Sequence, residues 1–129
     1  MIVADSSALL AVVLAEDDAA VFKNALLGQQ VGVSAATVTE ARIAVSRRAG
    51  LPAVTDLNSL LSIVRAKVVP YDDDHATIAH AAYSRFGKGQ HSAQLNFGDC
   101  MAYATAKIAG APLLFKGEDF RQTDIASAL

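Results

Sequence analysis

Four short apolar segments alternate with longer segments that have the pattern of helices, and this alternation leaves few folds open to the chain. The expected strands are residues 1–4, 31–33, 68–71 and 113–115. The expected helices are residues 6–16, 19–27, 35–48, 54–65, 72–86 and 97–109. Short strands separated by helices form parallel sheets that helices cover on both faces. We therefore predict an α/β protein, a three-layer α/β/α sandwich around a short, mainly parallel central sheet.

Residues that cap helices mark several of these boundaries. Ser34 and Asn96 each stand directly before an expected helix, where a side-chain oxygen accepts from a free backbone N–H. Gly28, Gly50 and Gly110 stand directly after expected helices, which is where glycine ends a helix most readily. The glycine-containing segment 87–95 is expected to be a loop.

The length and composition favour one domain, residues 1–129, with a core of small aliphatic side chains. The longest apolar run, Ala8–Ala15, is far shorter than the ~20 residues of a membrane helix. The single cysteine, Cys100, excludes an internal disulfide and fits a reducing compartment, so we predict a cytoplasmic protein without membrane association. The net charge of −2 argues against binding nucleic acid by overall charge, so any such contact must be local.

Several acidic residues lie where a parallel sheet places its ligands, just beyond the carboxyl ends of the strands. Asp5 follows the first strand, and Glu118 and Asp119 follow the last one. Glu40 borders the apolar stripe of the helix after the second strand, and Asp99 lies in the first turn of a helix among small residues. Taken singly, each has a simpler interpretation as a helix cap, a solvated residue or a turn residue.

Taken together, these acids indicate a site for a hard divalent cation. Carboxylates gathered in one place raise each other's pKa unless a cation neutralises them. Ligand sets made of oxygen alone select Mg²⁺, or Mn²⁺ as the alternative, and the three histidines lack zinc spacing. Such an ion activates water and neutralises charge that develops on phosphorus, so the pattern favours phosphodiester hydrolysis by one ion or two.

Four segments of the sequence resemble the PIN-domain ribonucleases, and most of all the VapC toxins of bacterial type II toxin–antitoxin pairs. The segments are Val3–Leu9 (VADSSAL), Thr39–Glu40, Asn96–Ala104 (NFGDCMAYA) and Leu113–Phe120 (LLFKGEDF). They occur in the order of the family and span almost the whole chain.

The resemblance implies Mg²⁺-dependent endonucleolytic cleavage of RNA, neutralisation by a VapB-type antitoxin, and a homodimer. The positions that it assigns to catalysis and metal binding are Asp5, Glu40, Asp99 and Asp119. Glu118 is the second choice for the fourth acid. Ser6 takes the place of the small hydroxyl residue that often follows the first acid in the family.

Two other functions remain open alternatives. A metal-dependent phosphatase acting on a small molecule would also use acids at strand ends, but the second Asp expected two residues after Asp5 is absent. A non-catalytic PIN-like module that binds RNA or protein would more often have lost one of the acids. Ser6 and Ser7 lack the partners of a catalytic serine, and Cys100 is expected to be a buried small residue.

Three basic residues near the expected site are candidate RNA contacts. They are Arg85 and Lys88, at or near the loop 87–95, and Lys116, directly after the last strand. Such side chains bind phosphate oxygens and position a strand without reading its sequence.

We expect Lys88→Ala to weaken RNA binding and to flatten its dependence on salt, because binding with one phosphate contact fewer releases fewer counterions. Binding measured over a series of salt concentrations checks this. A salt slope equal to that of the unchanged protein would contradict it.

Overall fold

The computed structural model describes all 129 residues and contains one sheet of four parallel strands. The strands are β1 (Ile2–Ala4), β2 (Val31–Ser34), β3 (Lys67–Val69) and β4 (Leu113–Leu114), in the spatial order β3-β2-β1-β4. The helices are α1 (Ser6–Val13), α2 (Ala19–Leu27), α3 (Ala35–Ala49), α4 (Leu51–Ile63), α5 (Asp73–Phe86) and α6 (Phe97–Ala109). A short 3₁₀ helix, η1 (Phe120–Gln122), follows β4.

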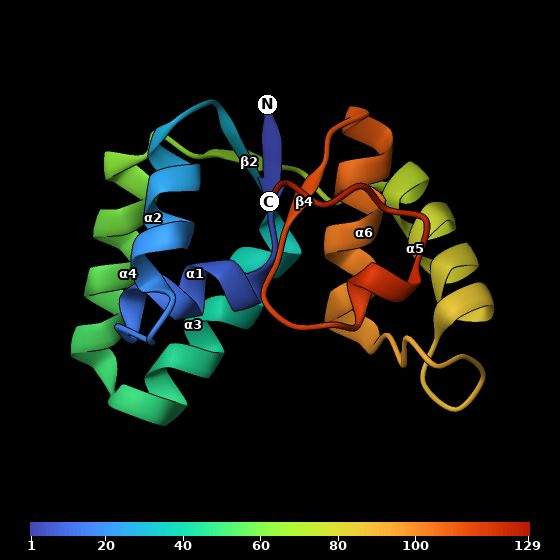
Figure 1. Ribbon diagram of the computed structural model, residues 1–129, viewed down its shortest axis with the longest axis horizontal. Coiled ribbons are helices and arrows are strands. Elements are labelled where there is room, and N and C mark those ends of the chain that lie inside the picture. Colours follow the sequence, from blue (N-terminus) through green and yellow to red (C-terminus); the bar gives the residue numbers. More distant parts are fainter.

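Helices cover both faces of this sheet, as the sequence predicted. Figure 1 shows α1, α2 and α4 on one side of the strands and α5 and α6 on the other. Each side has its own buried apolar cluster, and alternate residues of β1 divide between them. Ile2 and Ala4 pack with α1–α4, whereas Val3 packs with α5 and α6. This alternation follows from the two-residue period of a strand, and it gives the sheet a core on each face.

The predicted caps hold the helices that carry the site. Ser34 accepts from the N–H of Ala36 at 3.2 Å and begins α3. Asn96 accepts from the N–H of Asp99 at 2.8 Å and begins α6. Gly110 ends α6 with φ +62°, the left-handed conformation that glycine adopts without strain.

Three predicted boundaries were wrong by a few residues. The first helix ends at Val13 instead of residue 16, because Ala15 has φ +51° and leaves the helical region. The fourth helix begins at Leu51, earlier than residue 54, with Pro52 in its first turn. The third strand ends at Val69 instead of residue 71, since Pro70 has no N–H to continue the ladder.

The residues after η1 return to the sheet and pair with β4, which the sequence did not predict. Leu113 donates its N–H to the carbonyl of Ala126 at 2.8 Å, and Ala128 donates to the carbonyl of Leu113 at 2.9 Å. This pairing covers the outer edge of β4. None of the helices combines the length and the apolar character needed to cross a membrane.

The core that supports the sheet is tested by two leucines of α4. Leu57 is 0% exposed within the cluster of α1–α4, whereas Leu51 is 77% exposed on the same helix. We expect Leu57→Ala to lower the free energy of unfolding by about 2–5 kcal/mol, because it leaves a cavity. Leu51→Ala, the matched control, should change it by less than about 0.5 kcal/mol in urea denaturation. Equal losses for the two variants would contradict the assignment of this core.

Candidate active site

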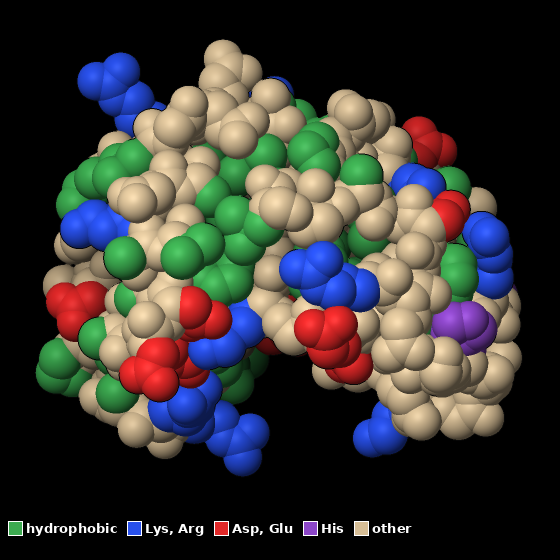
Figure 2. All heavy atoms as spheres, in the orientation of Figure 1, with side chains coloured by type: hydrophobic (Ala, Val, Ile, Leu, Met, Phe, Trp, Pro, Cys, Tyr) green, Lys and Arg blue, Asp and Glu red, His purple; other side chains and the backbone are tan.

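The carboxyl ends of the four strands meet at one edge of the molecule, which lies at the bottom of Figure 1. Asp5 follows β1 there, and Asp119 lies beyond the end of β4. Glu40 comes from α3, which follows β2, and Asp99 lies in the first turn of α6, which runs back along the sheet and begins at this edge. Figure 2 shows that the surface is hollowed here, between a lobe of α1–α4 and a lobe of α5 and α6.

Asp5 is a buried carboxylate, 3% exposed, with one oxygen bound and one oxygen free. Its Oδ2 accepts from the backbone N–H of Ser7 at 3.1 Å and from the Ser7 hydroxyl at 2.6 Å. Its Oδ1 is buried and has no hydrogen-bond partner. Burial raises the pKa of Asp5 to about 6, the Ser7 bonds oppose that rise, and the charge of Glu40 adds to it.

Asp99 is held by reciprocal hydrogen bonds with Asn96. The backbone N–H of Asn96 donates to Asp99 Oδ2 at 2.9 Å, while Asn96 Oδ1 accepts from the backbone of Asp99. This capping box fixes the carboxylate at the start of α6. Burial and, to a smaller extent, the charges of Asp5, Glu40 and Asp119 together raise the pKa of Asp99 to about 7, against the opposing hydrogen bond from Asn96. The charges of all four predicted acids therefore act at one place.

Glu40 reaches across to the first turn of α6 and lies against Gly98. A Cβ atom at position 98 would overlap Oε2 and Cδ of Glu40, so only glycine leaves room for this side chain. Glu40 Oε1 is buried and has no hydrogen-bond partner. Sequence reasoning did not select Gly98, although a glycine inside a helix lowers its stability and so indicates a close approach.

The two adjacent acids after β4 differ in their surroundings. The charge of Asp119 is among the causes that raise the pKa of Asp99. Both acids are exposed, and Glu118 faces Arg121, whose Nε lies 3.8 Å from its carboxylate. The charge of Asp119 acting on Asp99, together with the pairing of Glu118 with Arg121, favours Asp119 as the fourth acid.

The hydroxyl that contacts Asp5 belongs to Ser7, the neighbour of Ser6, which the sequence analysis named as the hydroxyl residue following the first acid. An Asp that caps a helix accepts from the residue two positions later, and α1 puts Ser7 there. The Ser7 hydroxyl also accepts from the backbone N–H of Lys116 at 3.0 Å. Ser7 therefore connects Asp5 to the segment that leads from β4 to Asp119.

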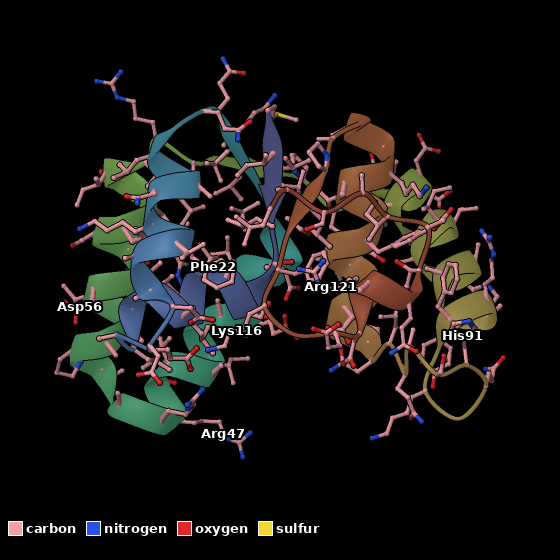
Figure 3. All side chains as sticks on the ribbon, in the orientation of Figure 1. Phe22, Arg47, Asp56, His91, Lys116 and Arg121 are labelled. Carbon is pink, nitrogen blue, oxygen red and sulfur yellow. The ribbon has the colours of Figure 1, made fainter.

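The three candidate RNA contacts have different surroundings. Lys116 Nζ is bound to Glu16 Oε1 at 2.9 Å and to Asp18 Oδ1 at 3.0 Å, and in Figure 3 it lies in the lobe of α1–α4. Arg85 lies 3.5 Å from Asp124. Lys88 forms no ion pair and is exposed in the loop after α5. Of the three, Lys88 is the one without an acidic partner in the protein.

The donor set fits a hard cation. All four acids offer oxygen, and the two buried oxygens without partners, Asp5 Oδ1 and Glu40 Oε1, are what such an ion satisfies. As the side chains stand, no three acidic, histidine or cysteine side chains converge closely enough to coordinate an ion together. Cys100 is buried, as predicted, and burial raises its pKa to about 11, so it is not a reactive thiol at neutral pH.

Known proteins resemble this chain along nearly its whole length. The PIN domain profile matches residues 2–126. Ribonuclease VapC of Mycolicibacterium smegmatis is 44% identical over 126 residues, which cover 97% of this chain and 98% of the relative. Ribonuclease VapC30 of Mycobacterium tuberculosis is 43% identical and covers 97% and 96%.

Solved structures share the fold at low sequence identity. The Mycobacterium tuberculosis toxin VapC20, described as cleaving the Sarcin-Ricin loop, superposes with a TM-score of 0.80 at 18% identity, covering 98% of this chain and 97% of that one. The VapBC2 complex of Rickettsia felis gives 0.76 at 14% identity, with coverage of 98% and 97%. The sequence relatives and the profile establish the family: the chain belongs to the PIN domains and, among them, to the VapC ribonucleases of toxin–antitoxin systems.

Proposed function

We propose that this VapC ribonuclease cleaves RNA phosphodiester bonds endonucleolytically, with Mg²⁺, or Mn²⁺ as the alternative, held by Asp5, Glu40, Asp99 and Asp119. The observation that carries the proposal is the raised pKa of two acids, about 6 for Asp5 and about 7 for Asp99. Burial and the charges of neighbouring acids cause both shifts. Buried carboxylates of this kind are stabilised in their charged form by a cation.

The ion, when bound, supplies an activated water and neutralises charge on the phosphate. The remaining work belongs to the chain itself. Ser7 binds Oδ2 of Asp5 and leaves Oδ1 without a partner, and the backbone N–H of Asn96 holds Oδ2 of Asp99. Gly98 leaves room for Glu40 to lie against α6. Asp5 and Asp99 thus each have a hydrogen-bonded support that fixes the carboxylate, which a metal site needs.

The partner in this proposal is a VapB-type antitoxin, and the protein acts as a homodimer in the cytoplasm. The lobe of α1–α4 supports a protein partner, since large apolar side chains are exposed on α2 and α4. They are Val21, Leu27, Leu51 and Ile63. An amphipathic helix of a partner buries such side chains in a groove.

Cleavage of a mixture of structured RNAs by purified, antitoxin-free protein tests the function. We expect cleavage with Mg²⁺ or Mn²⁺ and none with chelator. Asp99→Asn should reduce the rate more than about 100-fold, since even the outer partners of a metal site are worth 10- to 100-fold. Asn keeps an oxygen that can accept from Asn96, so the start of α6 is preserved.

The same assay separates the fourth acid from its neighbour. The single variant Asp119→Asn should lose activity, as Asp99→Asn does. The matched control Glu118→Gln should retain activity. Folded protein that cleaves no RNA in any metal would refute the proposal and favour the binding module. Hydrolysis of a small phosphate ester without cleavage of RNA would favour the phosphatase.

Gly98→Ala tests the support of Glu40. The new Cβ would displace the end of a flexible side chain, and Ala favours the helix by about 0.5–1 kcal/mol over Gly. We therefore expect cleavage to fall sharply while the thermal midpoint is retained or raised. Thermal unfolding and the cleavage assay on one preparation measure both. Full activity in this variant would show that Glu40 need not lie against α6.

A further inference from the structure

Phe97 is the most exposed large apolar side chain in the protein, and it lies two residues before Asp99. It is 79% exposed at the first position of α6. Phenylalanine at a helix start has no capping function, and burial in the core does not account for it. A single exposed apolar side chain is common on protein surfaces, so the significance of Phe97 depends on what surrounds it.

Two hollows flank this ring. One, of about 460 Å³, lies between α5 and α6, and its lining includes Tyr71, Tyr83, Asn96 and Lys88. The other, of about 380 Å³, lies between α3 and α6, and its lining includes Glu40 and Arg47 together with Phe97. Both volumes lie toward the small end of the range for ligand sites, about 300–1,000 Å³. Phe97 is therefore the wall between two small pockets. Glu40 lines the second, and Asn96, which donates to Asp99, lines the first.

The chemistry of these pockets matches a nucleotide. The first offers aromatic faces with one lysine at the rim, and the second joins an apolar wall to an arginine. Lys88 has no acidic partner, and Arg47 projects outward at the lower edge of Figure 3, so both are available to phosphates. Flat aromatic surfaces beside cations are the pattern of sites that bind single-stranded nucleic acid.

We propose that Phe97 is a base-stacking residue, which holds the base of a nucleotide next to the scissile phosphate in the hollow between α5 and α6. The inference rests on the proposed ribonuclease function and adds a residue that positions its substrate. Asn96 and Cys100 line that hollow and bracket Asp99 in the sequence, so a base there belongs to a nucleotide next to the acids. A base can enter only when it is unstacked, so the substrate is a single-stranded or looped segment of RNA.

The test measures binding of a short single-stranded oligoribonucleotide by fluorescence anisotropy. Ca²⁺ replaces Mg²⁺, since it shares the preference for oxygen ligands. The intact strand is compared with strands that carry an abasic residue at each position in turn. We expect Phe97→Ala to weaken binding of the intact strand about 5- to 150-fold, the range of one base–aromatic stack. One abasic position should cause a similar loss, and the two changes together should cause little more.

Two variants serve as controls. Phe97→Tyr keeps a stacking surface and should keep the affinity. Ile108→Ala removes an apolar side chain that is 46% exposed near the opposite end of α6 and should leave RNA binding unchanged. Analytical ultracentrifugation of each variant records the oligomeric state.

Equal affinity of Phe97→Ala and the unchanged protein for the intact strand would overturn the inference. The inference would also be overturned if the loss of affinity caused by Phe97→Ala added in full to the loss caused by an abasic residue at every position of the strand. Weak binding that accompanies dissociation into monomers would assign Phe97 to contact between two copies of the chain and would also overturn it. These outcomes differ from failure of the proposed function, in which the unchanged protein cleaves no RNA with any metal.

Discussion

The buried carboxylate of Asp5 is the constraint on which this edge of the protein depends. It ends the central strand β1, caps α1 and accepts two hydrogen bonds from Ser7. Because Ser7 in turn accepts from Lys116, the same carboxylate is connected to the exit of β4. One oxygen is thus used to join two strands and a helix, while the other has no hydrogen-bond partner. In the proposed site, one side chain therefore serves both the fold and the binding of the cation.

The distribution of charge explains how a chain of net charge −2 can act on a polyanion. Lys116 is neutralised by Glu16 and Asp18, so it balances acids of the α1–α2 turn and not those of the site. The four site acids have no basic partner close enough to form an ion pair. A cation from solution therefore supplies the positive charge on which the proposed activity depends.

Features fixed by neighbouring residues were predictable from the sequence. Asn96 and Gly110 bound α6 as predicted, because caps act within a few residues. Family resemblance, in addition, selected acids far apart in the chain. Contacts between distant segments were not predicted: Gly98 against Glu40, and Lys116 against Glu16 and Asp18. The hydrogen bond between Ser7 and Asp5 depends on the first turn of α1, which sequence spacing alone does not fix.

The pairing of β4 with the residues near the C-terminus has a consequence for the order in which the protein matures. β4 has only two residues. Leu113 bonds to Ala126 and Ala128, while the carbonyls of Pro112 and Leu114 accept from Val3 and Asp5 on the side of β1. During synthesis the rest of the sheet and six helices precede this strand, and domains gain structure as their segments emerge. The segment carrying Asp119 is secured on both sides only once residues 126–128 exist. A nascent chain thus keeps an incomplete acidic site until residues 126–128 have been synthesised and have folded back onto β4.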